Sequence, residues 1–181
     1  MDIPITPSNH LTTSNFDYEL PKTLIAQTPL EPRDESRLLI LNRSDQSLSH
    51  GHTFKQIVDY LYPGDLLIFN DSRVLHCRLN GINNESKGAV ELLLINRISE
   101  GIWRCLGKPG RRLRTGSTLS FQKRNWGCNA EILDSLSHGF KIVHFDNESV
   151  LPHLGSLPLP PYIRRPIDDP ERYQTIYSKN P

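Results

Sequence analysis

The chain has 181 residues and a formal net charge of +1; 36% of its residues are hydrophobic and 23% are charged. This length accommodates one ordinary domain or two small ones, and the composition is that of a globular protein. Because the charges nearly balance, overall charge does not indicate a nucleic-acid partner. Only local clusters of basic residues bear on that question.

Targeting and cysteine signals are weak throughout the chain. The first eleven residues lack the basic patch and apolar run of a signal peptide. No stretch reaches the roughly 18 consecutive apolar residues of a membrane span. The three cysteines, Cys77, Cys105 and Cys128, form no Cys-x-x-Cys pair, which argues against a disulfide framework or a zinc site. We therefore expect a cytoplasmic protein without a metal.

The first predicted elements are a short helix and a strand pair. Residues Pro21–Gln27 indicate a helix opened by proline. The apolar run Arg37–Asn42 predicts a buried strand, and Leu48–His52 returns as its partner after a turn.

A helix and a third strand are predicted next. Thr53 is typical of a helix N-cap, and the apolar residues that follow it lie at helical spacing. Pro63 and Gly64 end this helix. The wholly apolar run Leu66–Phe69 then predicts another buried strand.

The middle of the chain predicts a small β-barrel. Short strands follow one another with Asn, Gly and Ser between them, and no long helical period appears. The expected strands are Val74–Leu79, Ala89–Asn96, Ile102–Leu106, Ser117–Phe121, Asn129–Leu133 and Phe140–Phe145.

The last third begins with a short helix and continues as an extended segment. Asn147 caps the predicted helix and Gly155 ends it. Repeated prolines in Leu157–Pro166 favour an extended, polyproline-like path.

These elements predict an α+β, mostly β, protein in which a small barrel is inserted into a larger mixed α/β domain. We expect residues 72–146 to form the barrel. Residues 1–71 and 147–181 would be parts of the larger domain, which these segments leave incomplete because they cannot bury much core by themselves.

Polar clusters stand at the ends of two predicted strands. Arginines and carboxylates crowd the segment Pro29–Arg37, just before the first strand, and Asn70–Arg73 directly follows the strand Leu66–Phe69. Side chains at strand ends are rigidly placed and meet solvent, which suits a binding site. The alternatives are a solvated loop with local ion pairs for the first cluster and an Asx-type turn for the second.

Two further segments suggest anion binding. The loop Gly107–Gly116 carries four basic residues, and no Asp or Glu lies between Gly101 and Ala130. A barrel with a basic loop can hold a nucleic-acid backbone, although a solvated hairpin is the alternative. The stiff segment Leu157–Arg165 presents Tyr162 and two arginines, or serves only as a linker.

Taken together, eight stretches resemble successive signature blocks of the S-adenosylmethionine:tRNA ribosyltransferase-isomerases of queuosine biosynthesis, in the order of that family. Ser72 departs from the usual threonine but keeps the hydroxyl. The family also continues well beyond the block that ends this sequence. The matching stretches are Phe16–Pro21, Leu24–Gln27, Pro29–Leu39, Pro63–Val74, Gly88–Leu94, Gly107–Gly116, Pro158–Ile163 and Glu171–Tyr177.

The resemblance implies a reaction. The ribosyl part of S-adenosyl-L-methionine is transferred to a tRNA that carries 7-aminomethyl-7-deazaguanine at the wobble position, and it is isomerised there. Epoxyqueuosine-tRNA forms, and adenine and methionine leave. The resemblance implies no metal and a monomeric enzyme. Because the family is longer, we expect the 181 residues alone to be inactive.

Residue roles follow from what this chemistry demands. The sulfonium acidifies hydrogens on the adjoining ribose carbon, so a base is needed, and Asp34 and Asp71 are the catalytic candidates. Aromatic faces suit the sulfonium and arginines suit the methionine carboxylate. The substrate-binding candidates are Arg33, Arg37, Asn70, Arg73, Tyr162, Arg164 and Tyr173, and the tRNA-binding candidates are Lys108, Arg111, Arg112 and Arg114.

One geometric expectation links the two strand-end clusters: Asp34, Arg37, Asn70 and Arg73 should converge on one pocket. Two other functional classes stay open from the sequence. One is a tRNA-binding module without catalysis, and the other is a truncated product without function.

Overall fold

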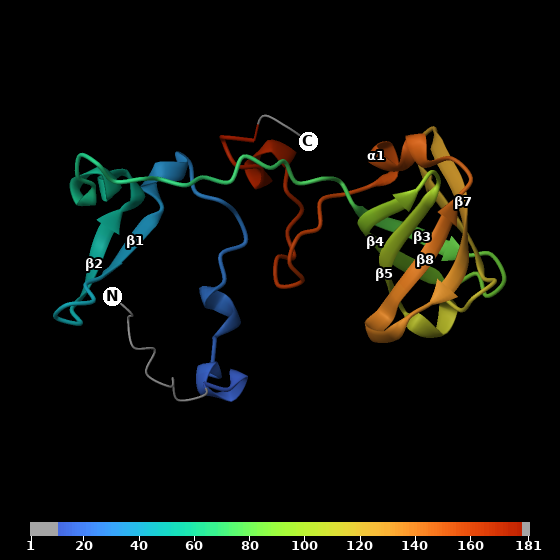
Figure 1. Cartoon of the computed structure of the whole chain (residues 1–181), viewed down its shortest axis with the longest axis horizontal. Coiled ribbons are helices and arrows are strands. Elements are labelled where there is room, and N and C mark those ends of the chain that lie inside the picture. Colours follow the sequence, from blue (N-terminus) through green and yellow to red (C-terminus); the bar gives the residue numbers. More distant parts are fainter. Residues whose placement is uncertain (1–10, 179–181) are drawn as a thin grey trace, which may run out of the picture.

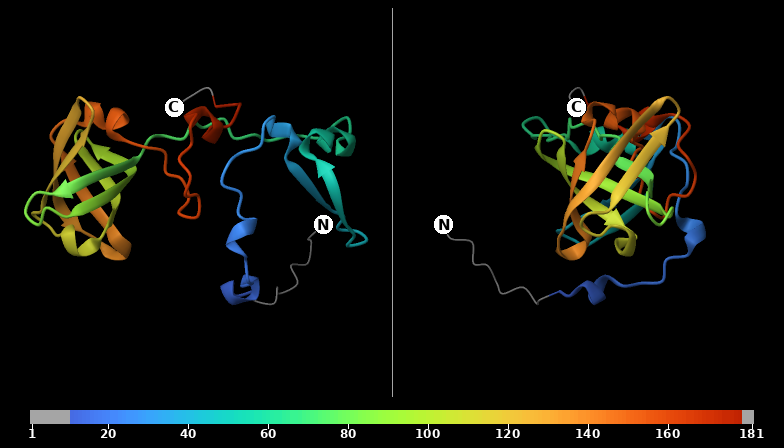
Figure 2. Two further views of the ribbon diagram at one scale, coloured as in Figure 1. Left: turned by 180° about the vertical axis from the view of Figure 1, so that it is seen from behind. Right: turned by 90° about the vertical axis from the view of Figure 1, so that its right-hand side faces the viewer.

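The computed structural model describes residues 11–178, so the expectation about a signal peptide lies almost wholly outside the described residues. The chain forms a β-barrel at one end of the molecule and a looser set of segments beside it (Figure 1). The rear view in Figure 2 shows the same division, and the view turned by 90° looks onto the barrel with the other segments behind it. Within residues 11–178 no helix is long and apolar enough to cross a membrane.

Six antiparallel strands close the barrel in the order β3-β4-β5-β8-β7-β6. Closure pairs every strand on both sides, which removes exposed sheet edges. The predicted barrel and the mostly β fold are thereby confirmed. The strands are β3 Arg78–Asn83, β4 Ala89–Ser99, β5 Ile102–Lys108, β6 Thr118–Lys123, β7 Trp126–Ser135 and β8 Phe140–Phe145.

The strand predicted at Val74–Leu79 was placed too early, since β3 runs over Arg78–Asn83. The glycine and asparagines of β3 suggested a turn, but the close packing around them requires these residues in the strand. A Cβ at Gly81 would lie 2.6 Å from the Phe121 side chain. Asn83 is buried, and its side chain donates to the carbonyl of Arg112 at 2.8 Å.

The hydrophobic core lies entirely in the barrel and the short helices that cover it. Phe121 and Phe145 are its largest fully buried side chains, and every buried hydrophobic residue falls between residues 79 and 154. The segment after β8 forms η7 Glu148–Val150 and α1 Leu151–Leu154. Val150, Leu151 and Leu154 belong to the same core.

Asn147 caps this helical segment as predicted, because its side chain accepts a hydrogen bond from the Ser149 amide. Glu148 then fastens the segment to the barrel. Its carboxylate pairs with Arg97 and accepts a 2.9 Å hydrogen bond from the indole of Trp103. The Arg97 guanidinium and then the Trp103 indole lower the pKa of Glu148 to about 2.

The chain enters and leaves the barrel at one place, which we call the neck. Arg78 and Ser156 pair in both directions: the Arg78 amide donates to the Ser156 carbonyl at 3.1 Å, and the Ser156 amide donates back at 2.9 Å. A Cβ at Gly155 would lie 1.7 Å from the carbonyl oxygen of His76, so the two segments touch at this glycine. Adjacent entry and exit support the insertion proposed from the sequence, and its boundaries stay a prediction.

Outside the barrel the secondary structure is short. The strands β1 Arg37–Leu41 and β2 Leu48–Thr53 pair as expected, but they form a separate two-stranded sheet whose residues are half-buried or exposed. The other short elements are the 3₁₀ helices η1 Thr13–Phe16, η2 Lys22–Leu24, η3 Arg33–Glu35, η4 Phe54–Tyr60, η5 Gly110–Arg112, η6 Ser137–Gly139 and η8 Pro170–Tyr173.

Three of the predictions outside the barrel need correction. The helix expected at Pro21–Gln27 is reduced to η2, and the helix after Thr53 is the 3₁₀ helix η4. The run Leu66–Phe69 is not a buried strand. Leu66 and Ile68 are 85% and 88% exposed, because no strand among residues 11–178 pairs with this run. The only aromatic contact of the run among these residues is that of Phe69, whose ring centroid lies 4.6 Å from that of Tyr177.

The Glu148 contacts predict a pH-dependent contribution to stability. The folded pKa of Glu148 is lowered from its ordinary value of 4.5, so its contribution is full above about pH 4.5 and is lost as the pH falls toward 2. We expect Glu148→Gln to lower the melting temperature at pH 6 and to have a shrinking effect below pH 4.5. Thermal unfolding followed by circular dichroism measures this.

The matched control is Glu85→Gln, which removes an exposed carboxylate that makes no ion pair within residues 11–178. A gap between wild type and Glu148→Gln that stayed constant down to pH 2 would contradict the assignment.

Candidate functional site

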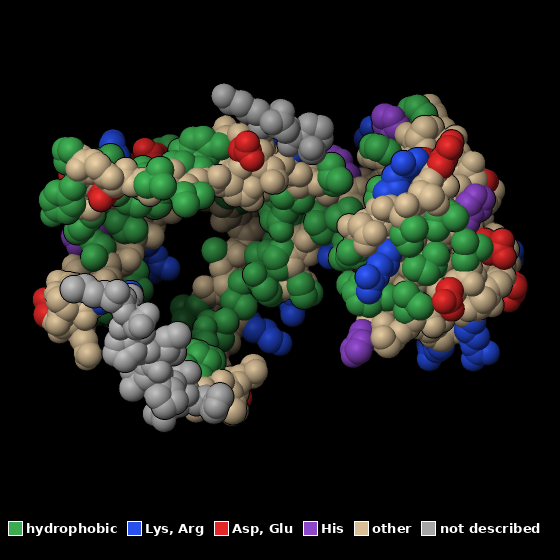
Figure 3. All heavy atoms as spheres, in the orientation of Figure 1, with side chains coloured by type: hydrophobic (Ala, Val, Ile, Leu, Met, Phe, Trp, Pro, Cys, Tyr) green, Lys and Arg blue, Asp and Glu red, His purple; other side chains and the backbone are tan. Residues whose placement is uncertain are grey.

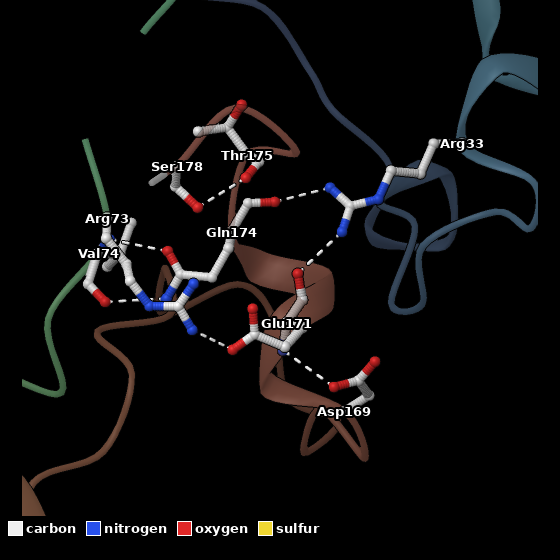
Figure 4. A network of polar contacts seen from close by, with 8 residues as sticks. All are labelled: Arg33, Arg73, Val74, Asp169, Glu171, Gln174, Thr175 and Ser178. Atoms are coloured by element: carbon white, nitrogen blue, oxygen red, sulfur yellow. Dashed lines mark hydrogen bonds and ion pairs between the residues drawn. The ribbon is translucent and has the colours of Figure 1, made fainter. Parts of the chain in front are cut away.

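Three distant parts of the chain meet at the helix η8, and we call this meeting point the junction (Figure 4). It comprises Arg33 from the first polar cluster, Arg73 and Val74 from the segment before the barrel, and Glu171 and Gln174 from η8 and its C-cap. Asp169 caps η8 by accepting a hydrogen bond from the Glu171 amide at 3.0 Å.

Arg33 holds η8 through backbone carbonyls. Its two terminal nitrogens donate to the carbonyl oxygens of Gln174 at 2.6 Å and Glu171 at 2.8 Å. The Gln174 carbonyl lies past the C-terminal end of η8, where helix carbonyls lack internal partners. The Glu171 carbonyl also accepts from the Gln174 amide at 3.1 Å, so Arg33 is its second donor. A guanidinium is suited to this place because its donors form a rigid fork.

Gln174 joins η8 to the segment that leads to the barrel. Its side chain is buried, and it accepts from the Val74 amide at 2.8 Å and donates to the Val74 carbonyl at 2.9 Å. The side-chain amide of Gln174 thus makes the two hydrogen bonds with the Val74 backbone that a neighbouring strand would otherwise make. Beside it, Arg73 pairs with the carboxylate of Glu171 at a partly exposed position.

A second set of contacts encloses a cavity of about 410 Å³ lined by Lys22, Ile25, Gln27, Tyr162, Arg164 and Arg165. The side chain of Gln27 donates to the Tyr162 carbonyl at 3.0 Å and accepts from the Arg164 amide at 2.8 Å. It fixes the proline-rich segment, which turns at Pro160–Ile163. The Tyr162 ring is half-exposed at this cavity.

The remaining strand-end candidates lie at the surface. Asp34 and Asp71 are exposed. Asn70 closes the Asx-type turn considered from the sequence, since its side chain accepts from the Ser72 amide at 2.9 Å. Arg37 is exposed at a separate cavity of about 410 Å³ next to β2, and Tyr173 is half-buried.

The two clusters therefore meet only in part. Arg33 and Arg73 both bind η8, whereas no hydrogen bond or ion pair within residues 11–178 joins Asp34, Arg37 or Asn70 to Arg73. Convergence of these four side chains on one pocket stays a prediction. The sequence reasoning missed Gln27, Glu171 and Gln174 as site residues, because a lone amide or carboxylate in a loop has no periodic signal.

The basic loop lies at one end of the barrel, where Figure 3 shows Lys and Arg side chains gathered at the lower edge. The loop has no acidic neighbour in the sequence, but an acid reaches it in the fold, because Lys108 pairs with Glu91 of the neighbouring strand at 3.1 Å. Arg112 is half-buried and donates to the carbonyl of Ala89 at 2.8 Å. Arg111 and Arg114 are exposed, with no polar side-chain contact within the described residues.

Over residues 13–181 the chain matches the family described as "Queuosine biosynthesis protein". It is 46% identical over 170 residues to the S-adenosylmethionine:tRNA ribosyltransferase-isomerase of Dehalococcoides mccartyi, and 43% identical over 173 residues to that of Staphylococcus haemolyticus.

These alignments cover 93% of this chain, and 49% and 50% of the relatives, so the chain spans about half the length of the curated relatives it matches. A solved structure, the S-adenosylmethionine tRNA ribosyltransferase of Thermotoga maritima, is 40% identical with a TM-score of 0.38. That match covers 77% of this chain and 48% of the solved one.

The junction predicts that Gln174 positions the segment before the barrel. We expect Gln174→Ala to speed hydrogen exchange of the Val74 amide by about tenfold or more, because a buried group left without its partner costs about 1–3 kcal/mol. Exchange monitored by NMR gives the rate, and the exposed Gln122→Ala is the control. An unchanged Val74 rate would show that Gln174 holds nothing in place.

Proposed function

Because this chain belongs to the queuosine biosynthesis protein family, we propose that it forms the N-terminal half of an S-adenosylmethionine:tRNA ribosyltransferase-isomerase. The observation that carries the proposal is the 46% identity that extends over 93% of the chain to a protein with that name. In the proposed reaction the ribosyl group of S-adenosyl-L-methionine is transferred to 7-aminomethyl-7-deazaguanine in tRNA and isomerised, and adenine and methionine are released.

The contacts of the arginines separate their proposed roles. Arg33 has both terminal nitrogens engaged with η8, and Arg73 is paired with Glu171. Arg37 is exposed, and its side chain makes no polar contact within residues 11–178. Of the three, Arg37 is therefore the best placed to receive the methionine carboxylate, whereas Arg33 and Arg73 position η8 and Tyr173.

The base and the groups that face the sulfonium follow from accessibility. Asp34 and Asp71 are both exposed, so either carboxylate can meet a substrate and accept a proton from the carbon next to the sulfonium. Tyr162, with Arg164 beside it, offers a half-exposed ring at a cavity of about 410 Å³. An aromatic face there would stabilise a sulfonium through its quadrupole.

The activity test uses adenine release. We expect the 181 residues to release no adenine from S-adenosyl-L-methionine, because the relatives are about twice as long. A full-length enzyme that carries this half should release adenine only with tRNA bearing the aminomethylated base. Chromatography of labelled adenine measures both, and tRNA with unmodified guanine at the wobble position is the control.

Two outcomes of this test would be informative against the proposal. Adenine release by the 181 residues alone would refute the expected dependence on a second half. A full-length enzyme that binds tRNA without ever releasing adenine would favour the non-catalytic binding module.

The loop at the end of the barrel is proposed to contact tRNA phosphates through Lys108, Arg111, Arg112 and Arg114. Each phosphate contact contributes a slope of about 0.7 to 0.9 in log affinity against log salt. Arg111→Ala should flatten the salt dependence of tRNA binding by about that amount. Arg112→Ala should also loosen the contact with Ala89 and lower the melting temperature.

Fluorescence anisotropy of a labelled tRNA at several salt concentrations provides the slopes. The control is Arg43→Ala, an exposed arginine in the turn between β1 and β2 with no polar side-chain contact within residues 11–178. Parallel slopes for wild type and Arg111→Ala would show that Arg111 contacts no phosphate and belongs to a solvated hairpin.

A further inference from the structure

A basic groove runs along the neck, between the barrel and the segment that leaves it. It has a volume of about 560 Å³. The barrel contributes Arg78 and Asn80 from β3 and Lys123 from the end of β6, and the departing segment contributes Arg164 and Arg165. Figure 3 shows basic side chains both on the barrel and on the chain beside it.

The charge of the groove is strongly one-sided. Four permanent cations line it against a single carboxylate, Glu91. That carboxylate is already shared, since it lies 3.1 Å from the Lys108 ammonium and 3.5 Å from Nε of Arg78. Glu91 lies opposite Lys108 on β5 and opposite Asn80 on β3, with Arg78 as its diagonal neighbour on β3, so it serves as a cross-strand bridge. It leaves the other cations of the groove without a carboxylate partner in the described chain.

Two of the cations form hydrogen bonds that hold the walls of the groove together, and the other two make no polar side-chain contact within the described residues. Arg78 donates to the Leu159 carbonyl at 3.0 Å, and Lys123 donates to the Gly155 carbonyl at 2.7 Å, so both hold the departing segment against the barrel. Nε of Arg78 is buried and has no hydrogen-bond partner, because the Glu91 contact is an ion pair without hydrogen-bond geometry. Arg164 and Arg165 are exposed and make no polar side-chain contact within residues 11–178.

The groove also adjoins the cavity described above beside Gln27. Arg164 and Arg165 line the cavity of Lys22 and Tyr162 as well, so two hollows share one pair of arginines. An extended run of cations along connected hollows matches a polymer of phosphates better than a single small anion, because each phosphate of a backbone can face a different cation.

We propose that this neck groove binds the sugar-phosphate backbone of the RNA substrate, with Arg165 and Arg164 contacting phosphates and Asn80 at the groove wall. This inference rests on the proposed function for the identity of the polyanion. It adds a second RNA contact, distinct from the loop at Gly107–Gly116, and it places RNA between the barrel and the rest of the chain.

Binding of labelled tRNA to the 181-residue chain tests the groove. Arg165→Gln removes one free cation, and Asn80→Asp adds a negative charge on the groove wall with almost no change of shape. Arg165→Gln should weaken tRNA binding about tenfold at low salt and flatten the salt slope by about 0.7 to 0.9. Asn80→Asp should also weaken binding, and it should lower the melting temperature slightly, because the new carboxylate faces Glu91 across the strand pair.

The matched controls carry the same substitutions elsewhere. Arg43→Gln removes an exposed arginine far from the barrel, and Asn96→Asp adds the same charge on β4 outside the groove lining. Both should bind tRNA as wild type does. Inorganic phosphate is titrated against sodium chloride of equal ionic strength, and it should displace tRNA no better than the chloride.

Each result decides a different point. If wild type binds tRNA and both groove variants behave like their controls, the groove is refuted and the proposed function is untouched. If phosphate competes beyond its ionic strength, the groove is a small-anion site and the backbone assignment is overturned. If wild type binds no tRNA, the groove proposal fails, whereas adenine release by the full-length enzyme still judges the proposed function.

Discussion

Closure of the six-stranded barrel is the constraint on which the rest of the structure depends. Every buried hydrophobic side chain of the described residues lies between residues 79 and 154, inside the barrel or under the helix that covers it. Burial of apolar surface is the main favourable term in folding. The segments on either side of the barrel therefore have little apolar driving force of their own, and Leu66 and Ile68 stand in solvent as a result.

Directed polar contacts hold those outer segments instead. The pair of Arg73 with Glu171 is partly exposed, and such pairs contribute little stability. The bonds from Arg33 to the Gln174 carbonyl and from the Gln174 side chain to Val74 are of another kind, because they satisfy backbone groups that have no strand or helix partner. The geometry of the junction is thus set by side chains that form hydrogen bonds to backbone groups. These bonds fix the positions of Tyr173 and the arginines.

The parts of this structure that the sequence predicted are those with a repeating pattern. Strand β8 runs over Phe140–Phe145 as expected, because alternate residues face the core and turn residues bound the run. The run Leu66–Phe69 failed for a physical reason: apolar content indicates that a strand would be stable if covered, but not that a partner lies beside it. The roles of Gln27 and Gln174 could not be predicted from the sequence, since each side-chain amide bonds to a segment far away in the chain.

At the neck, one glycine connects the apolar barrel to the outer segments that polar contacts hold. Gly155 has a φ of −67°, which any residue adopts, so its role is not conformational. What requires glycine is space, because a Cβ would lie 1.7 Å from the carbonyl oxygen of His76. That close approach brings the Gly155 carbonyl to Lys123 and the departing chain to Arg78. A larger residue would push the two segments apart and open the groove at its base. The shape of this basic surface therefore depends on a backbone contact that carries no charge.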